Sequence, residues 1–308
     1  MRIIIFGLGF IATHLAIELS SIGEVLVTYR NLSPLKREYA SLLEDKVKLI
    51  RVDPLVDDLG NIVNGADAVI NAIGALRGDL RAAHIEAPKL IARAAVKAGA
   101  TLIHVSASNA LGPRGSMVTE EDKHCEGAAP SNEYEFTKCE GEKAVYGEAV
   151  KGGIPFAIIR PTLVYGEYAA HGEWFLMYRA AKLGIIPRVG LSVSSISAVS
   201  LARIVRELIH VKPRGLYMYA TECNQVPIER FMEIMSTALS RRAIKVPVPS
   251  FLAMLALPSS VRQLAKYAGV KYDCSKARKL VGELVFDDEQ VRRNALFLKR
   301  LEESGIKE

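Results

Sequence analysis

The first half of the chain alternates short, continuous apolar runs with longer segments in which apolar residues recur at helical spacing. Continuous apolar runs are typical of parallel strands that helices cover on both faces. The expected strands are residues 2–6, 25–29, 47–51, 68–72, 101–106 and 156–160. The expected helices lie near residues 14–20, 81–98 and 134–151. This order predicts an α/β protein with a doubly wound parallel sheet of the Rossmann type.

The alternation loosens after Arg160-Pro161, where the pattern becomes mostly helical and is punctuated by prolines. A strand and a helix at residues 193–209 are expected to return to the sheet. We therefore assign residues 1–165 and 192–211 to a Rossmann core. Residues 166–191 and 212–308 are assigned to a smaller, mostly helical substrate-binding lobe.

A chain of 308 residues that is 50% hydrophobic can bury a large core, and it fits one two-lobed unit as well as two separate domains. We favour the single unit. Neither the histidines nor the four cysteines (Cys125, Cys139, Cys223 and Cys274) show metal-ligand spacing. Such scattered cysteines favour a reducing compartment, so we expect a cytoplasmic location and no disulfide framework. The longest later apolar run, residues 251–257, is much shorter than the roughly 20 residues that a membrane-spanning helix needs.

The net charge of +6 comes from the last quarter of the chain. Residues 1–240 hold 26 Lys and Arg against 26 Asp and Glu, whereas residues 241–308 hold 14 against 8. If this quarter lines the substrate cleft, it favours an anionic small molecule, although a solvated basic surface explains the same numbers equally well. Nucleic acid is not expected, because the basic residues occur in pairs without interleaved aromatic residues.

A glycine turn, Gly7-Leu8-Gly9-Phe10-Ile11-Ala12, follows the first expected strand and opens the first expected helix. In this context two closely spaced glycines allow a tight turn and the close approach of a pyrophosphate. The core is therefore expected to bind a dinucleotide through Gly7, Gly9, Phe10 and Ile11.

The end of the second expected strand carries no acidic residue. A carboxylate that binds the cofactor ribose is expected there, about 20 residues after the turn, but the chain has Arg30-Asn31 instead. Arg30, helped by Asn31, is placed to bind a 2′-phosphate, whose charge an Asp would repel. This predicts NADP as the cofactor, with NAD as the alternative.

Two further segments are candidates for cofactor contacts. The fourth expected strand ends in Ala72, Ile73 and Gly74, which are mostly small and let backbone pass close beneath a cofactor. Asp53, after the third strand, could accept a hydrogen bond from the adenine amino group, or it could cap a turn.

Tyr134 and Lys138 are four residues apart in an expected helix, so their side chains share one face. An ammonium beside a phenol lowers the phenol's pKa from its usual value of about 10. Together with an upstream dinucleotide turn, the pair predicts hydride chemistry on an alcohol or a ketone.

Several other segments carry a family resemblance. They are Asn71-Ala72-Ile73-Gly74, Val105-Ser106-Ala107-Ser108, Leu111-Gly112, Thr119-Glu120-Glu121 and Arg160-Pro161-Thr162-Leu163-Val164-Tyr165-Gly166. With the glycine turn and Tyr134-x-x-x-Lys138, they make almost the whole chain resemble the extended short-chain dehydrogenases/reductases, specifically the NAD(P)-dependent epimerase/dehydratase family.

The resemblance implies a role for each matching position. Tyr134 would be the general acid/base, while Lys138 would bind the nicotinamide ribose and depress the pKa of Tyr134. The backbone of Pro161, Thr162 and Leu163 would pack around the nicotinamide. The resemblance also implies a homodimer formed through the helices near residues 81–98 and 134–151.

The chain departs from the family pattern at several positions. The first family glycine falls on Phe6. The Ser or Thr that usually binds the substrate oxygen falls on Ala107, which leaves Ser108 as the first candidate for that role and Ser106 as the second. His84 replaces an Asn that is common in the family.

These features predict an NAD(P)-dependent epimerase or ketoreductase that uses Tyr134 and Lys138 on a substrate hydroxyl or ketone. A nucleotide sugar is the expected substrate. The alternative is a non-catalytic NADP-binding subunit or redox sensor of the atypical short-chain dehydrogenase type, which the missing family Ser and Asn favour and the intact Tyr-Lys pair opposes.

Overall fold

The computed structural model describes residues 1–113, 115, 117–119, 128–248, 262 and 265–306. Its centre is a seven-stranded sheet whose neighbouring strands are all parallel. In spatial order the strands are β12 (Arg214–Ala220), β7 (Phe156–Pro161), β5 (Thr101–Val105), β4 (Ala68–Asn71), β1 (Arg2–Phe6), β2 (Glu24–Tyr29) and β3 (Lys48–Arg51). The strand order reverses between β1 and β4, which makes this the switch point where Rossmann folds bind ligands.

Two layers of helices cover the sheet because each inner strand buries apolar side chains on both faces. In β1, Ile3 and Ile5 belong to one buried cluster and Ile4 and Phe6 to the other. The first layer is α1 (Phe10–Leu19), α2 (Pro34–Leu43) and α7 (Ala198–Val211). The second layer is α3 (Leu59–Val63), the π-helical turn η1 (Ala82–Glu86), α4 (Ala87–Ala98) and α5 (Glu133–Gly152).

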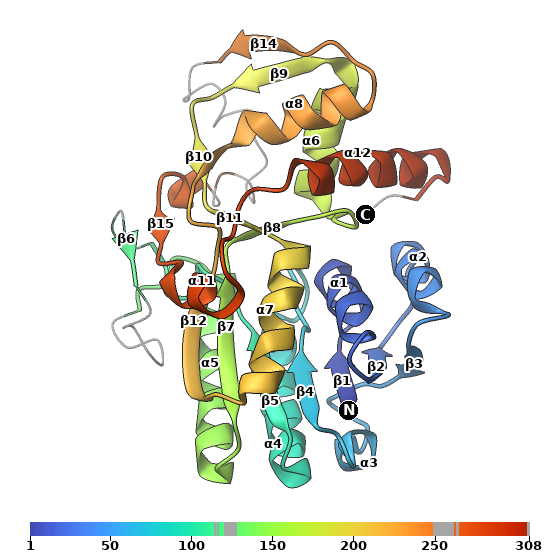
Figure 1. Cartoon of the computed structure of the whole chain (residues 1–308), viewed down its shortest axis with the longest axis vertical. Coiled ribbons are helices and arrows are strands. Elements are labelled where there is room, and N and C mark those ends of the chain that lie inside the picture. Colours follow the sequence, from blue (N-terminus) through green and yellow to red (C-terminus); the bar gives the residue numbers. More distant parts are fainter. Residues whose placement is uncertain (114, 116, 120–127, 249–261, 263–264, 307–308) are drawn as a thin grey trace.

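A smaller lobe lies beyond the carboxyl ends of the strands (Figure 1). Its helices are α6 (Gly172–Leu183), α8 (Ile228–Ala238), α12 (Asp288–Glu303) and the 3-10 turn η3 (Ala265–Tyr267). A further helix from this part of the chain, α11 (Ser275–Val281), packs against α7 and β12 of the core. Two-stranded pairs complete it and join it to the core: β14 (Ile244–Pro247) with β9 (Ile185–Arg188), β10 (Ser192–Val193) with β13 (Val226–Pro227), β11 (Ser195–Ser197) with β8 (Leu163–Tyr165), and β15 (Lys271–Tyr272) with β6 (Met117–Val118).

Core and lobe share one hydrophobic cluster, which contains Ile3 of β1 as well as Trp174 and Phe231 of the lobe. A polar junction reinforces it at the end of β8. The Tyr165 hydroxyl donates to Glu222 Oε1 at 2.7 Å and accepts from the Asp287 amide at 2.6 Å. This continuity agrees with the expectation of one two-lobed unit.

The six strands predicted in the first half are confirmed within a residue or so at each end, as is the doubly wound parallel sheet. The predicted lobe began at residue 212, and this boundary is wrong at β12. Residues 214–220 pair with β7 and form an edge of the central sheet. No helix among the described residues has the length and apolar character needed to span a membrane.

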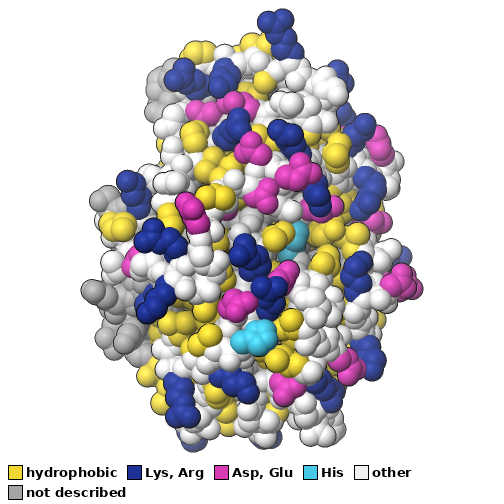
Figure 2. All heavy atoms as spheres, viewed as in Figure 1, with side chains coloured by type: hydrophobic (Ala, Val, Ile, Leu, Met, Phe, Trp, Pro, Cys, Tyr) yellow, Lys and Arg dark blue, Asp and Glu magenta, His cyan; other side chains and the backbone are white. Residues whose placement is uncertain are grey.

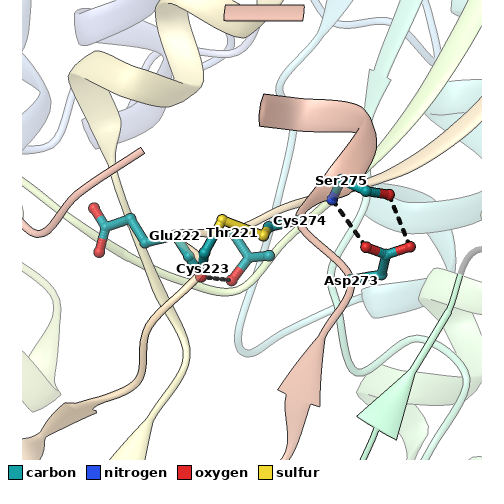
Figure 3. The surroundings of a disulfide bond; sticks show 6 residues. All are labelled: Thr221, Glu222, Cys223, Asp273, Cys274 and Ser275. Carbon is teal, nitrogen blue, oxygen red and sulfur yellow. Dashed lines mark hydrogen bonds between the residues drawn. A yellow bond between two sulfur atoms is a disulfide. The ribbon is translucent and has the colours of Figure 1, made fainter. Parts of the chain in front are cut away.

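The sequence predicted no disulfide framework, but the described residues contain a disulfide bond. Cys223 and Cys274 are joined, with their Cα atoms 5.4 Å apart and a separation of 51 positions in sequence (Figure 3). The bond links the segment after β12 to the start of α11. Their wide separation in sequence hid a contact that only the fold creates, and no described cysteine is free.

Reducing this bond is expected to lower the stability of the protein, because a cross-link over 51 residues limits the unfolded chain. The chain-entropy estimate is at most about 4 kcal/mol. Thermal unfolding of the parent should be compared with Cys223→Ser/Cys274→Ser. Peptide mapping without reductant should yield a linked pair of peptides that contain Cys223 and Cys274. Recovery of both residues as free thiols would contradict the cross-link.

Candidate active site

The glycine turn lies at the switch point of the sheet, between β1 and α1. Gly7 has φ of +106°, a conformation that favours glycine, and a Cβ there would lie 3.1 Å from the Ala72 carbonyl oxygen. Its amide donates to the Thr28 hydroxyl at 3.3 Å. The turn therefore needs glycine at this position both for its backbone angle and for its packing against the end of β4.

Gly9 caps α1 without any side-chain hydrogen bond to the first turn. A Cβ at Gly9 would meet no atom within 4 Å, so the space in front of the helix is open. The amides of Phe10 and Ile11 begin the helix and have no intrahelical acceptor. Helix amides that a ligand can approach freely fit a pyrophosphate. The sequence predicted cofactor binding by these same residues.

Two basic residues converge where β2 ends. Arg30 follows the strand and is exposed, while burial and the nearby charge of Arg30 lower the pKa of Lys36. The exposed Ser33 caps α2 by accepting from the Lys36 amide at 3.3 Å. Asn31 is also exposed. Lys36 was not singled out from the sequence, although its place in the first turn of α2 could have suggested it.

The segment after β4 passes close to α5. The Asn71 side chain accepts from the Ile73 amide at 3.1 Å and bonds His104 Nδ1 at 3.0 Å, which fixes the end of the strand. Gly74 is exposed, and a Cβ there would lie 4.0 Å from Lys138 Nζ. The small residues Ala72 and Gly74 thus let the main chain run close to the Lys138 ammonium. We call this main-chain segment, from Ala72 to Ala75, the backbone passage.

Asp53, the other candidate for a cofactor contact, caps a turn. Its Oδ1 accepts from the Leu55 amide at 3.1 Å, and its own amide donates to Asp57 Oδ2 at 2.7 Å. One carboxylate oxygen is therefore committed to local structure.

Helix α5 carries Tyr134 and Lys138 one turn apart near its amino end. Asn132 caps the helix by accepting from the Glu135 amide at 2.9 Å, and Glu135 in turn accepts from the Asn132 side chain at 2.7 Å. Lys138 is buried, and its ammonium has one long bond, 3.5 Å to the Val105 carbonyl. An ammonium with spare donors beside the Gly74 passage fits the hydroxyl groups of a cofactor ribose.

Burial shifts the pKa values of both residues. It lowers the pKa of Lys138 to about 8, against the opposing charge of Glu142, and it raises the pKa of Tyr134 to about 12. The sequence predicted that Lys138 would lower the pKa of Tyr134. Instead the pKa of Tyr134 is raised, because desolvation of the phenol dominates.

The two candidate serines differ in their partners. Ser108 is hydrogen-bonded to the Tyr272 hydroxyl of β15. Ser106 is 4% exposed, and its hydroxyl has no partner among the described residues. A buried hydroxyl without a partner is costly unless a ligand completes it, so the geometry favours Ser106 over Ser108, the reverse of the sequence-based preference.

A buried ion pair beneath the site was missed from the sequence. Arg160 Nη2 and Glu142 Oε2 lie 2.6 Å apart, and both side chains are fully buried. Glu142 is one turn beyond Lys138, on the helix face that already holds Tyr134. The presence of Glu142 on the predicted inner face of this helix could have indicated a buried ion pair.

The other candidates are less central. Thr162 bonds the Ala220 carbonyl through its hydroxyl at 3.3 Å and is buried with Pro161, whereas Leu163 is half-buried. Glu120, Glu121, His124 and Cys125 lie outside the described residues.

The lobe contains a cleft of about 640 Å³ between β9, α8 and the start of α12. Arg188, Arg230 and Lys245 line it, along with three carboxylates. Asp288 pairs with Arg230 and Glu233 with Lys245, but no ion pair to Arg188 forms among the described residues. On the face in Figure 2, basic and acidic side chains are interspersed over the lobe, without a single basic patch.

The parallel sheet and the glycine turn at its switch point define a Rossmann-type α/β protein. More specifically, the chain belongs to the NAD dependent epimerase/dehydratase family, whose model matches residues 3–212.

Among curated proteins, the chain is 26% identical over 194 residues to a UDP-N-acetyl-alpha-D-glucosaminuronate decarboxylase from Bacillus cytotoxicus, covering 59% of this chain and 57% of that protein. It is 26% identical over 133 residues to a UDP-glucose 4-epimerase from Vibrio cholerae, covering 42% of this chain and 39% of that protein. The chain thus matches about half the length of these relatives, or less.

Solved structures match over almost the whole chain. A UDP-glucuronic acid 4-epimerase from Bacillus cereus in complex with NAD has a TM-score of 0.78 at 20% identity, covering 98% of this chain and 99% of that one. Its complex with UDP-glucuronic acid and NAD gives 0.77 at 20% identity, with 98% and 100% covered. At this identity the likeness shows the fold.

Three buried histidines make the stability of the fold sensitive to acid. Burial lowers the pKa of His14 to about 4 and, with the charge of Lys138, the pKa values of His84 and His104 to about 3. Below about pH 6.5 the unfolded chain binds protons that the folded chain excludes. Stability should therefore fall from pH 6.5 downwards, by up to about 1.4 kcal/mol per pH unit for each histidine.

Urea unfolding between about pH 7 and about pH 5 measures this slope. His104→Gln should make the slope shallower, whereas the exposed control His210→Gln should leave it unchanged. An unfolding midpoint that stays constant over this range would contradict the assignment of neutral buried histidines.

Proposed function

We propose that the chain is an NAD(P)-dependent epimerase or ketoreductase that acts on a nucleotide sugar, with Tyr134 as general acid/base and Lys138 as its partner. The observation that carries the proposal is the placement of both side chains on α5 at the carboxyl edge of the sheet. There Lys138 Nζ lies beside the exposed main chain at Gly74. Membership of the family supports the same assignment.

The glycine turn, the free amides of α1 and the passage at Gly74 are the proposed holders of the cofactor. When bound, the nicotinamide would accept a hydride from the substrate and return it. Lys138 would donate its spare hydrogen bonds to ribose hydroxyls, since its ammonium has one long protein bond. The buried Ser106 hydroxyl would orient the substrate oxygen.

Tyr134 would exchange the proton of that oxygen. Because its pKa is raised to about 12, the phenol is protonated near neutral pH and is ready to donate to a ketone oxygen. In the opposite direction the proton acceptor would be the phenolate form of Tyr134, which has first lost its own proton and which the Lys138 charge would stabilise. An epimerase would turn the ketone before the second transfer, whereas a ketoreductase would release the product.

The proposed substrate lies between the core and the lobe, which we assign as the substrate-binding part. Relatives act on UDP-linked sugars, and a structural neighbour binds UDP-glucuronic acid. Such substrates are anions. In the lobe cleft, Arg188 is outside any ion pair of the described residues and would be the contact for an anionic group, next to the carboxylate of Glu229, which also has no ion pair there.

We further propose that NADP is preferred over NAD. The 2′-phosphate would meet Arg30, Lys36 and the capped start of α2, where no acidic residue ends β2. The structural neighbours were solved with NAD, so this preference would separate the chain from them.

One observation favours the non-catalytic alternative, an NADP-binding subunit or sensor. Ala107 occupies the family's Ser position and Tyr272 engages Ser108, so only Ser106 remains to assist Tyr134. Turnover by the parent protein separates the two functions.

Tyr134→Phe is expected to reduce turnover by roughly a hundredfold or more, because general acid-base groups contribute about that much. The assay follows cofactor fluorescence during incubation with pooled nucleotide sugars, and sugar products are identified by chromatography. Tyr146→Phe on the same helix is not a suitable control, because Tyr146 is half-buried and packs on Phe156. The exposed Lys151→Ala serves instead. Equal turnover by Tyr134→Phe and the parent would reject the catalytic assignment.

Arg30→Ala is expected to weaken NADP binding by about tenfold or more while leaving NAD binding nearly unchanged, because it removes a charge-assisted contact to one phosphate. Calorimetric titration of both cofactors measures the ratio. Lys46→Ala, at the other end of α2, is the matched control. A preference that Arg30→Ala does not alter would exclude this residue from cofactor selection.

A further inference from the structure

His84 connects the backbone passage after β4 to the helix that carries Tyr134 and Lys138. It lies in the π-helical turn η1 and is 1% exposed. Its Nε2 faces the Ala75 amide at 3.2 Å, and its Nδ1 faces the Thr137 hydroxyl at 2.9 Å. Both ring nitrogens are therefore engaged, each by a different element.

The partners fix the protons on this ring. A backbone amide can only donate, so Nε2 must accept from Ala75. The Thr137 hydroxyl donates its own proton to the Glu133 carbonyl at 2.8 Å, so it accepts from Nδ1–H. The imidazole is consequently neutral with its proton on Nδ1, and a second proton would oppose the Ala75 amide.

The position of this bridge relates it to the proposed chemistry. Thr137 lies between Tyr134 and Lys138 on α5. The His84 ring also meets the Tyr134 ring edge to face, with centroids 5.2 Å apart and an interplanar angle of 88°. On its other side, Ala75 follows Gly74, the residue in front of Lys138 Nζ.

The backbone of the same turn is pressed against α5. A Cβ at Gly141 would overlap the His84 carbonyl oxygen, so the turn and the helix are in close contact at this point. The ring is therefore anchored at its own backbone, at Ala75 and at Thr137, and it cannot adjust to a loss of either hydrogen bond without exposing a buried polar group.

We propose that His84 is a positioning residue, which holds the Gly74-Ala75 passage and the Tyr134 ring at a fixed distance so that a nicotinamide ribose fits between Gly74 and Lys138. This inference rests on the proposed function for its kinetic consequences. The bridge itself is a property of the chain. A ring that merely fills space would be replaceable by any ring of similar size.

The first test compares His84→Phe, which keeps a ring and loses both hydrogen bonds, with His84→Gln, which keeps a donor and an acceptor. His84→Phe should raise the NADP Kd about tenfold and lower kcat by a similar factor, whereas His84→Gln should recover most of both. Thermal unfolding is recorded for each variant. Equal binding and turnover by His84→Phe and the parent would overturn the proposal, as would equal losses in both variants.

A second test removes the other partner of the ring. Thr137→Val deletes the hydroxyl at nearly constant volume and should produce part of the His84→Phe effect. The double variant should be no worse than His84→Phe alone, since both changes break one bridge. Fully additive losses would show that the two residues act separately and would overturn the bridge.

Hydrogen exchange at the Ala75 amide decides the inference without any activity. The amide should exchange faster in His84→Phe than in the parent and should be protected again in His84→Gln. If the parent protein turned over no nucleotide sugar, the proposed function would be contradicted, but exchange at the Ala75 amide could still be measured. Unchanged exchange of the Ala75 amide in His84→Phe would contradict the positioning role of His84, even if the enzyme is active.

Discussion

The attachment of α5 to the sheet depends on the buried ion pair between Glu142 and Arg160. Arg160 donates through Nε and Nη2 to the Glu142 carboxylate, and its guanidinium lies 5.0 Å from the centre of the Tyr217 ring. Removing one partner of such a pair would leave an unpaired buried charge, which typically costs 3–5 kcal/mol. The pair thus fixes α5 against β7 and β12, and with it the register of Lys138 and Tyr134 over the strand ends.

The carboxyl edge of the sheet is enclosed by segments that come from far along the chain. Tyr267 donates to Glu135 at 2.6 Å, Tyr272 bonds Ser108, and the Cys223–Cys274 bond follows immediately after β15. Each contact joins the lobe to the start of α5 or to the end of a core strand. The lobe therefore limits which groups at this edge can still hydrogen-bond a ligand. The buried Ser106 hydroxyl has no partner among the described residues, whereas Ser108 has one.

Much of the fold follows from continuous apolar runs, because strands buried on both faces cannot carry polar residues at alternate positions. Residues 2–6 predicted β1 to the residue, and the spacing of Tyr134 and Lys138 placed both on one face of a helix. β12 was missed because it lies within a segment that was assigned to the lobe. Its two tyrosines pack on Arg160, a contact that sequence spacing does not reveal.

The errors at the site have a common physical origin in burial. From the sequence, Lys138 was a cation that would acidify Tyr134; in the fold both groups lose water, so the phenol becomes less acidic and the ammonium more so. The one carboxylate that favours the charged lysine, Glu142, is already paired with Arg160, and the neighbouring His84 and His104 are neutral. Among the described residues, the positive charge of Lys138 is thus poorly compensated. Ribose hydroxyls and an anionic substrate would supply the missing partners, so ligand binding and the ionisation of Tyr134 are expected to be coupled through Lys138.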